Sequence, residues 1–234
     1  MRKHLVTVLL GTASLLLTLS SSQSVSAAEG VKAAGDLAPL PLKLPDPTLK
    51  GTPDDLPTGP NIEKLSDKPR PAFFAPKGVT NVALKKKVTV SEPKLISGTI
   101  EQVTDGQREA FDEQVIEMRK GTQWVQVDLG GEYTLHAIVI WHDHRWLQVF
   151  RDVIVQVADD AEFTKNVHTV YNSDVDNSSN LGVGTDREYF ETNQGRLIDC
   201  KGIKGAFVRS YTKGSSLSSF NCHQEIEVYG LPAK

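Results

Sequence analysis

Residues 123–141 read QWVQVDLGGEYTLHAIVIW, and this stretch decides the fold class. Every second residue from Val125 to Leu129 is apolar, which is the period of a β-strand with one buried face. Residues 134–141 are apolar on both faces apart from His136, a pattern typical of a central strand in a sandwich. The Gly130-Gly131 pair predicts a turn between the two strands.

Short strand-like segments continue along the chain on both sides of this stretch. RDVIVQVA at 151–158 again carries valine at alternate positions. Further strands are expected at 167–171, 187–191, 206–212 and 225–229. One segment, 109–118, has helical spacing because Phe111, Val115 and Met118 share a helical face. Many short strands separated by turn residues predict an all-β antiparallel β-sandwich of the jelly-roll kind.

The composition divides the 234 residues into three parts. A basic start at 2–4, an apolar run at 5–19 and small residues near Ala27 and Ala28 predict a signal peptide over 1–28. That run is too short for a membrane span, so the mature chain is expected to be exported, to the periplasm or outside the cell, with no transmembrane segment.

Ten of the twelve prolines lie from Pro39 to Pro76, which predicts a Pro-rich extended linker over 29–76. Two interpretations stay open: a spacer without fixed structure, or a strip that docks a partner or lies along the folded domain. Phe73 and Phe74 are the residues expected to pack back on that domain, which spans 77–234.

The charge and the cysteine content argue against several classes of protein. The formal net charge is −3, and 77–234 alone has 18 Lys and Arg against 22 Asp and Glu, so general nucleic-acid binding is not expected. Two cysteines are too few for a disulfide-rich scaffold or a four-cysteine zinc site. Cys200 and Cys222 form a disulfide only if their strands bring them together, and antiparallel pairing places Cys222 near Thr212 instead.

Several segments in order carry a family resemblance: NVALKKKVTVS at 81–91, IEQVTDG at 100–106, the stretch from Trp124 to Trp141, RDVIVQVADDAEF at 151–163, AFVRSYT at 206–212 and EIEVYG at 225–230. Together they resemble the discoidin domain, the coagulation factor V/VIII type C module of the galactose-binding-like superfamily. That superfamily includes bacterial carbohydrate-binding modules. The resemblance covers Asn81 to Gly230 and implies a lectin-like sandwich whose loops bind ligands at one end.

The resemblance also implies a structural calcium site. The matching carboxylates are Asp105, in Thr104-Asp105-Gly106, and Glu225. Backbone carbonyls are expected from Gln102, Gln107 and Gln224, and calcium favours such all-oxygen ligand sets. The segment REAFDEQVIEM lacks the hydroxyl that the family usually supplies, and Asp112 or Glu113 would have to replace it. The alternative is that Asp105 caps a turn and Glu225 faces solvent or pairs with a lysine.

Two loops carry the side chains that suit a sugar. His144, Arg145 and Trp146 offer an aromatic face and planar hydrogen-bonding groups, and Phe220 and Asn221 follow a Ser-rich turn. His142 and His144 lie two residues apart, but no third ligand accompanies them, so a binding loop is favoured over a metal site. The alternative is a packed cluster at a strand end.

No motif for a catalytic triad, a zinc protease helix or a phosphate-binding loop occurs, so an enzyme is not expected. The leading hypothesis is a secreted, non-catalytic binding module for a carbohydrate or glycoconjugate. The alternative is a structural or cell-adhesion module that docks a protein at the envelope or in an extracellular assembly. A lipid-headgroup binder ranks third because the domain is net acidic.

Overall fold

The computed structural model describes residues 37–48, 54–111 and 114–233. The predicted signal peptide, 1–28, lies outside the described residues. The strands are β1 (Leu37–Pro39), β2 (Phe74–Pro76), β3 (Thr80–Asn81), β4 (Lys87–Val90), β5 (Ile116–Met118), β6 (Gln123–Trp141), β7 (Ile154–Ala158), β8 (His168–Asn172), β9 (Arg196–Thr212), β10 (Asn221–His223) and β11 (Glu225–Pro232). A short 3₁₀-helix, η2, spans Ile100–Thr104. Among the described residues no helix is long and apolar enough to cross a membrane.

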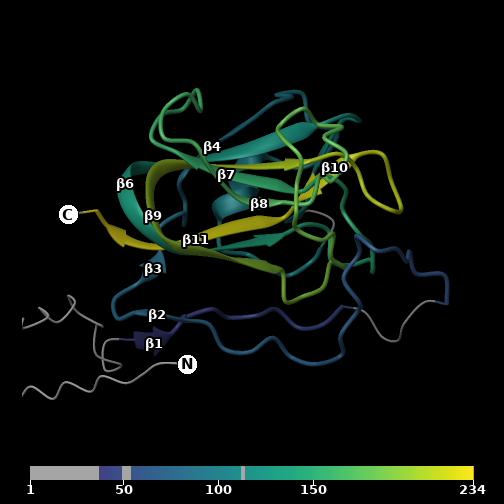
Figure 1. The fold of residues 1–234 in the computed structure, drawn as a ribbon, viewed down its shortest axis with the longest axis horizontal. Helices are drawn as coiled ribbons and strands as arrows, with labels where there is room; N and C mark the ends of the chain where they lie inside the picture. The colour runs from purple at the N-terminus through teal and green to yellow at the C-terminus, as the bar shows by residue number, and fades with distance from the viewer. Residues whose placement is uncertain (1–36, 49–53, 112–113, 234) are drawn as a thin grey trace, which may run out of the picture. The chain divides into compact units, whose positions relative to one another are not determined.

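Two long, bent strands, β6 and β9, build both layers of an antiparallel β-sandwich (Figure 1). The first half of β6 pairs with β4 and with the second half of β9, which in turn pairs with β7. The second half of β6 pairs with β11 and with the first half of β9. The predicted sandwich is therefore confirmed, but the two strands predicted around Gly130 are halves of one strand. Gly130 has φ +74, which lets the chain bend there while the pairing with β9 shifts between Asp128 and Tyr133.

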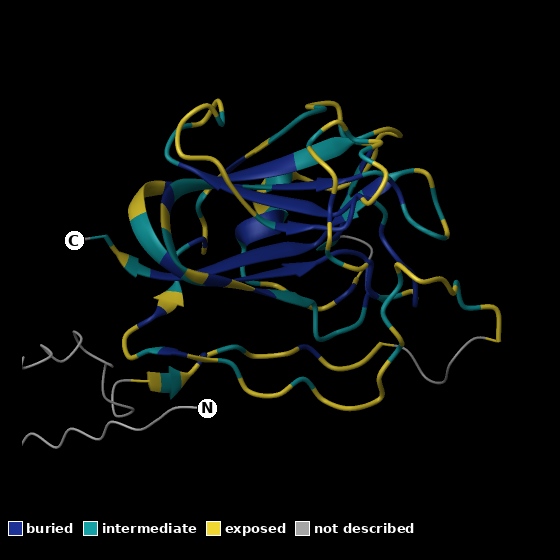
Figure 2. Cartoon of the chain, viewed as in Figure 1, coloured by how far each residue is buried: buried dark blue, intermediate teal, exposed yellow. Residues whose placement is uncertain are grey.

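The core lies between the two layers, where the strands are buried (Figure 2). Val125 and Val127 from one half of β6 share a cluster with Ile138 and Ile140 from the other half. All four side chains are fully buried. The alternation predicted for 125–129 thus corresponds to the inward face of the first layer.

The helix predicted over 109–118 is wrong for the residues described there. Ile116 to Met118 form β5, which pairs antiparallel with β10 through Met118 and Asn221. Phe111, expected on the buried helical face, is 61% exposed. Pairing with a strand a hundred residues away overrides the helical spacing, because it buries Ile116 and Met118 against the core.

Residues 37–48 and 54–76, the arm, lie along the outer face of the second layer. β1 pairs with β2, and the arm residues Leu40 and Ala75 form a second apolar cluster with Val139, Trp141 and Tyr229. Phe73 packs against this cluster, whereas Phe74 is 55% exposed. The arm explains why residues 134–141 are apolar on both faces: one face meets the core and the other meets the arm.

Polar contacts fix the arm at its far end. The Glu63 carboxylate accepts two hydrogen bonds from the Arg196 guanidinium, at 2.8 and 2.9 Å. Backbone bonds join Glu63 to Glu188 and Glu188 to Asn61, at 2.8 and 2.9 Å. The described part of the predicted linker is thus held against the domain by main-chain and charged contacts.

Both cysteines are free thiols. Cys200 lies in β9 and belongs to the core cluster, whereas Cys222 lies in β10 opposite Glu117. Burial raises the pKa of both thiols to about 12.

Candidate ligand-binding loops

Both ends of β6 and both ends of β9 lie at one end of the sandwich, because each strand bends back at the opposite end (Figure 1). The loops 119–122, 142–153, 173–195 and 213–224 therefore gather there. Direct hydrogen bonds join them: Ser216 N donates to the Val149 carbonyl at 2.8 Å, and Glu191 N donates to the Gln148 carbonyl at 2.7 Å. This loop end is the candidate binding surface.

Trp146 is the exposed aromatic residue of the loop 142–153, with 58% of its surface accessible. Its neighbour Arg145 is held by Asp143, whose carboxylate accepts from Nε and Nη2 at 2.7 Å each. A side chain fixed in this way loses less conformational entropy when it binds. These two consecutive residues offer an exposed aromatic ring and an oriented guanidinium.

The loop 213–220 lies beside Trp146's loop and adds further apolar surface. Ser215 Oγ donates to Gln148 Oε1 at 2.7 Å, and Gln148 donates to the Asp143 carbonyl at 2.9 Å. Leu217 on this loop is 63% exposed, and Phe220 is half-buried with the Lys120 ammonium 5.5 Å from its ring centre. The structure thus brings the two predicted loops together.

Two predicted ligand contacts lie beneath this surface. His144 is fully buried, and its Nε2 is 2.8 Å from the Arg108 carbonyl. Asn221 is also fully buried: its Oδ1 accepts from Thr212 and Gly214, and its Nδ2 donates to Arg119 and Gly121. A ligand on the surface therefore has no direct access to either side chain. Both residues join loops instead, which matches the packed-cluster alternative.

A polar layer that the sequence did not indicate underlies the loops. His142 stacks on Phe150 with ring centres 4.3 Å apart, and its Nδ1 is 2.9 Å from the Glu191 carboxylate. Burial lowers the pKa of His142 to about 3 and raises the pKa of Glu191 to about 8, so the neutral forms of both groups are favoured. The His142 Nε2 and His223 Nδ1 atoms have no hydrogen-bond partner in the part of the chain that the structure describes.

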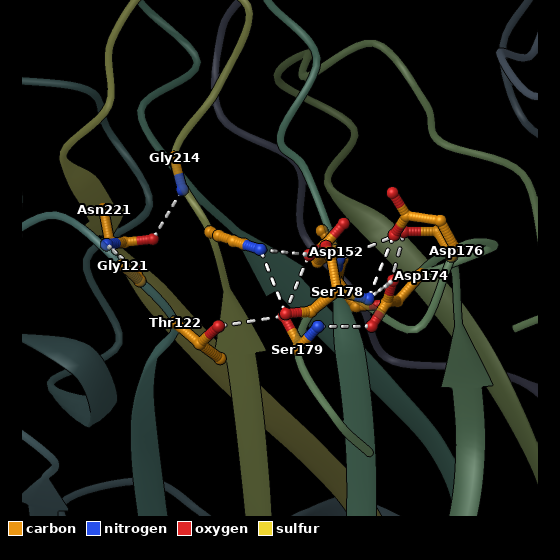
Figure 3. Close-up of polar contacts among 12 residues, drawn as sticks. Gly121, Thr122, Asp152, Asp174, Asp176, Ser178, Ser179, Gly214 and Asn221 are labelled. Atoms are coloured by element: carbon orange, nitrogen blue, oxygen red, sulfur yellow. Dashed lines mark hydrogen bonds and ion pairs between the residues drawn. The ribbon is translucent and has the colours of Figure 1, made fainter. Parts of the chain in front are cut away.

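A second group of polar residues lies at the loop end near the starts of β6 and β7 (Figure 3). The carboxylates of Asp152, Asp174 and Asp176 each place an oxygen within 4.8 Å of the others. Asp174 accepts from the backbone of Ser178 and Ser179, and Asp152 accepts from their hydroxyls. These bonds order the loop 173–180. It is the one group of three or more potential metal ligands among the described residues.

The residues predicted to hold calcium lie close together at η2 and β11. Glu225 is fully buried, and its two oxygens accept from Gly106 N at 3.2 and 3.3 Å. Burial, with the nearby charges of Glu227 and Asp105, raises the pKa of Glu225 to about 10. The alternative in which Glu225 faces solvent is wrong, because the side chain is inaccessible. Asp112 and Glu113 lie outside the described residues.

Comparison with known proteins identifies the domain. Residues 102–209 match the profile of the F5/F8 type C family, described as a NedA-like, galactose-binding domain. These residues form a discoidin-type domain. The predicted resemblance is therefore confirmed for this segment, although no curated protein sequence matches the chain.

Solved structures similar to the chain include several that bind sugars. CpGH89CBM32-4 from Clostridium perfringens, in complex with GlcNAc-α-1,4-galactose, is 17% identical, covers 66% of this chain and 96% of its own, and has a TM-score of 0.48. A fucose-binding module of Streptococcus pneumoniae is 18% identical, with 64% and 97% covered and a TM-score of 0.45. A fucolectin from Morone saxatilis serum is 18% identical, with 70% and 51% covered and a TM-score of 0.47.

The arm, which lies outside the matched segment, forms a groove with residues 189–197 of that segment. Two cavities of about 530 and 470 Å³ lie there, and they share a set of lining residues: Leu65, Ser66, Pro69, Thr192 and Gln194. We call the pair the arm groove. The sequence could not indicate it, because its two walls come from segments more than 120 residues apart.

Proposed function

We propose that the chain is a secreted, non-catalytic module that binds a carbohydrate or glycoconjugate through the loop end of its discoidin-type domain. One observation carries the proposal: Trp146 is an exposed aromatic residue of this loop, and it follows Arg145, whose guanidinium is oriented by Asp143. The ring face suits the C–H surface of a sugar, and the guanidinium donates to hydroxyl or ring oxygens. The match to a galactose-binding domain supports the same ligand class.

The test is binding to a glycan array, followed by calorimetric titration of the sugars that bind. Trp146→Ala is expected to weaken binding about two- to tenfold, since a contact with an aromatic ring contributes about 0.5–1.5 kcal/mol beyond the area that it buries. Val167→Ala is the control, because Val167 is also exposed but lies at the opposite end of the sandwich. Folded protein that binds no glycan, or a Trp146 variant with unchanged affinity, would contradict the proposal.

We also propose that Asp105 and Glu225 hold a structural Ca²⁺ ion. The donor set fits a hard cation: a buried carboxylate with only one backbone donor, an aspartate beside it and the carbonyls of a tight loop. Bound calcium would offset the cost of ionising Glu225 in a buried position. Millimolar calcium is expected to raise Tm relative to EGTA, by mass action. Glu225→Gln should abolish this increase, and an equal increase in the variant would contradict the site.

A further inference from the structure

The cavity of about 470 Å³ in the arm groove carries an excess of positive charge. Its charged lining consists of four basic residues, Lys64, Lys68, Arg70 and Arg196, and one acidic residue, Glu63. The Glu63 carboxylate is already bound by both terminal nitrogens of Arg196. Among the described residues no other carboxylate lines this cavity, although Asp67 lines the neighbouring one.

Arg70 is the basic group with the least compensation. Its Nη1 donates to the Gly195 carbonyl at 3.0 Å, and no ion pair joins it to a carboxylate among the described residues. Burial and the charge of Arg196 lower the pKa of Arg70, which shows that two cations repel one another there. An anion placed between them would reduce this repulsion.

Two buried donors lie beside the same cavity, the Tyr189 hydroxyl and the Nε atom of Arg196, and neither has a hydrogen-bond partner among the described residues. Both atoms are inaccessible to solvent, so they offer no direct contact to a ligand in the cavity. The preference for an anion therefore rests on the basic groups of the lining.

The neighbouring cavity, of about 530 Å³, has a different chemistry. Its lining includes hydroxyl and amide groups, from Thr192, Asn193 and Gln194 on one wall and from Ser66 on the arm, together with one carboxylate, Asp67. Leucine and proline residues supply most of the remaining lining. Hydrogen-bonding groups between apolar walls suit sugar rings better than the flexible backbone of a peptide.

We propose that the arm groove is a second binding site, which takes an acidic oligosaccharide. The sugar carboxylate would lie against Arg70 and the neighbouring basic residues Lys68 and Arg196, and the adjoining sugar residue would occupy the neighbouring cavity. The combined size of the two cavities is in the range of small-ligand sites. The choice of a sugar rests on the proposed carbohydrate-binding function, whereas the preference for an anion rests on the groove alone.

The test compares trigalacturonic acid with galactotriose, which differ in the carboxylate at C6, by calorimetric titration of the full chain at low salt. Trigalacturonic acid is expected to bind about tenfold more tightly, and the difference should shrink as salt is added. Arg70→Gln should lower its affinity about tenfold and remove the preference over galactotriose. Tyr189→Phe is the matched control and should leave this affinity unchanged, because the hydroxyl lies beside the cavity but is inaccessible to solvent.

Further arms of the experiment separate this site from the loop end. Trigalacturonic acid binding that disappears in Trp146→Ala but survives in Arg70→Gln would assign the sugar to the loops and overturn the inference. Equal affinity for tri-glutamate would overturn it in favour of an acidic peptide. Glycans that bind only through Trp146, with no response to trigalacturonic acid, would leave the proposed function standing and refute the groove. Trigalacturonic acid bound through Arg70, with no glycan at the loops, would support the groove and refute the loop site.

Discussion

Gly195 joins the discoidin-type domain to the arm, and replacing it with alanine tests how tightly that junction is packed. Its φ is +59, a region that costs a residue with a Cβ about 1–2 kcal/mol. A Cβ there would lie 2.7 Å from Cε2 of Trp141 and 2.9 Å from the Ile140 carbonyl. The indole cannot easily move, because it is fully buried and its Nε1 donates to the Asn193 carbonyl at 3.0 Å.

Overpacking of this kind costs about 1–3 kcal/mol, so Gly195→Ala should lose about 2–5 kcal/mol of unfolding free energy in total. The matched control is Gly202→Ala, because φ there is +78 but the nearest atom to a Cβ, in Thr134, is 3.8 Å away. The control should therefore lose only about 1–2 kcal/mol. For a domain of this size each kcal/mol lowers Tm by about 2–4 °C.

Urea denaturation followed by tryptophan fluorescence, with calorimetry for Tm, measures both variants. Because the Gly195 carbonyl accepts from Arg70, the first variant should also weaken trigalacturonic acid binding. Equal losses of stability in the two variants would show that the contact with Trp141 contributes nothing, and would refute the close packing.

Three further predictions concern the arm, the buried pair and the thiols. Glu63→Gln should cost about 1 kcal/mol in urea denaturation because it removes a bidentate charged contact, whereas Glu132→Gln, whose partner Lys204 is 3.7 Å away and exposed, should change stability by less than about 0.5 kcal/mol. Glu191 has a pKa raised from 4.5 to about 8, so the folded state holds its proton more tightly and stability should fall as pH rises through that range. His142 has a pKa lowered from 6.5 to about 3, so stability should also fall as pH drops below 6.5. Glu191→Gln should make the decline between pH 4.5 and about 8 shallower, while the part due to Glu225, whose pKa is raised to about 10, remains. An unchanged slope in this variant would contradict the assignment. Both cysteines, with pKa values near 12, should react with a thiol reagent at about pH 8 only after urea unfolds the protein, and fast reaction of the folded chain would show that they are accessible.

Much of the fold could be predicted because strand patterns are local. The alternation around Val125 and the apolar run ending at Trp141 predict which strand faces are buried. In the structure these faces lie in the core or under the arm. The helical spacing at 109–118 gave a wrong prediction because the structure of this segment depends on a distant partner strand. The same apolar positions suit a strand, and only the partner β10 decided between the two.

The candidate site was predictable in its location but not in its detail. The two predicted loops do meet at one end, and Trp146 is exposed there. His144 and Asn221 have the right chemistry for a ligand, yet both are buried. Which side of a loop faces solvent depends on the loops packed behind it. These contacts join residues about a hundred positions apart, such as Asn221 and Arg119, so the local sequence does not reveal them.

By itself the sequence determined the sandwich fold. Buried and exposed side chains alternate along a strand, so the pattern can be read from residues that are close in sequence. It also set a net charge of −3, which excludes a general polyanion binder. Only the tertiary structure placed Arg196 beside the arm's Lys64, Lys68 and Arg70, and so created a local cationic groove on an acidic protein. Charge totals are sums over the chain, whereas electrostatic attraction depends on distance, and folding alone sets the distance between residues more than 120 positions apart.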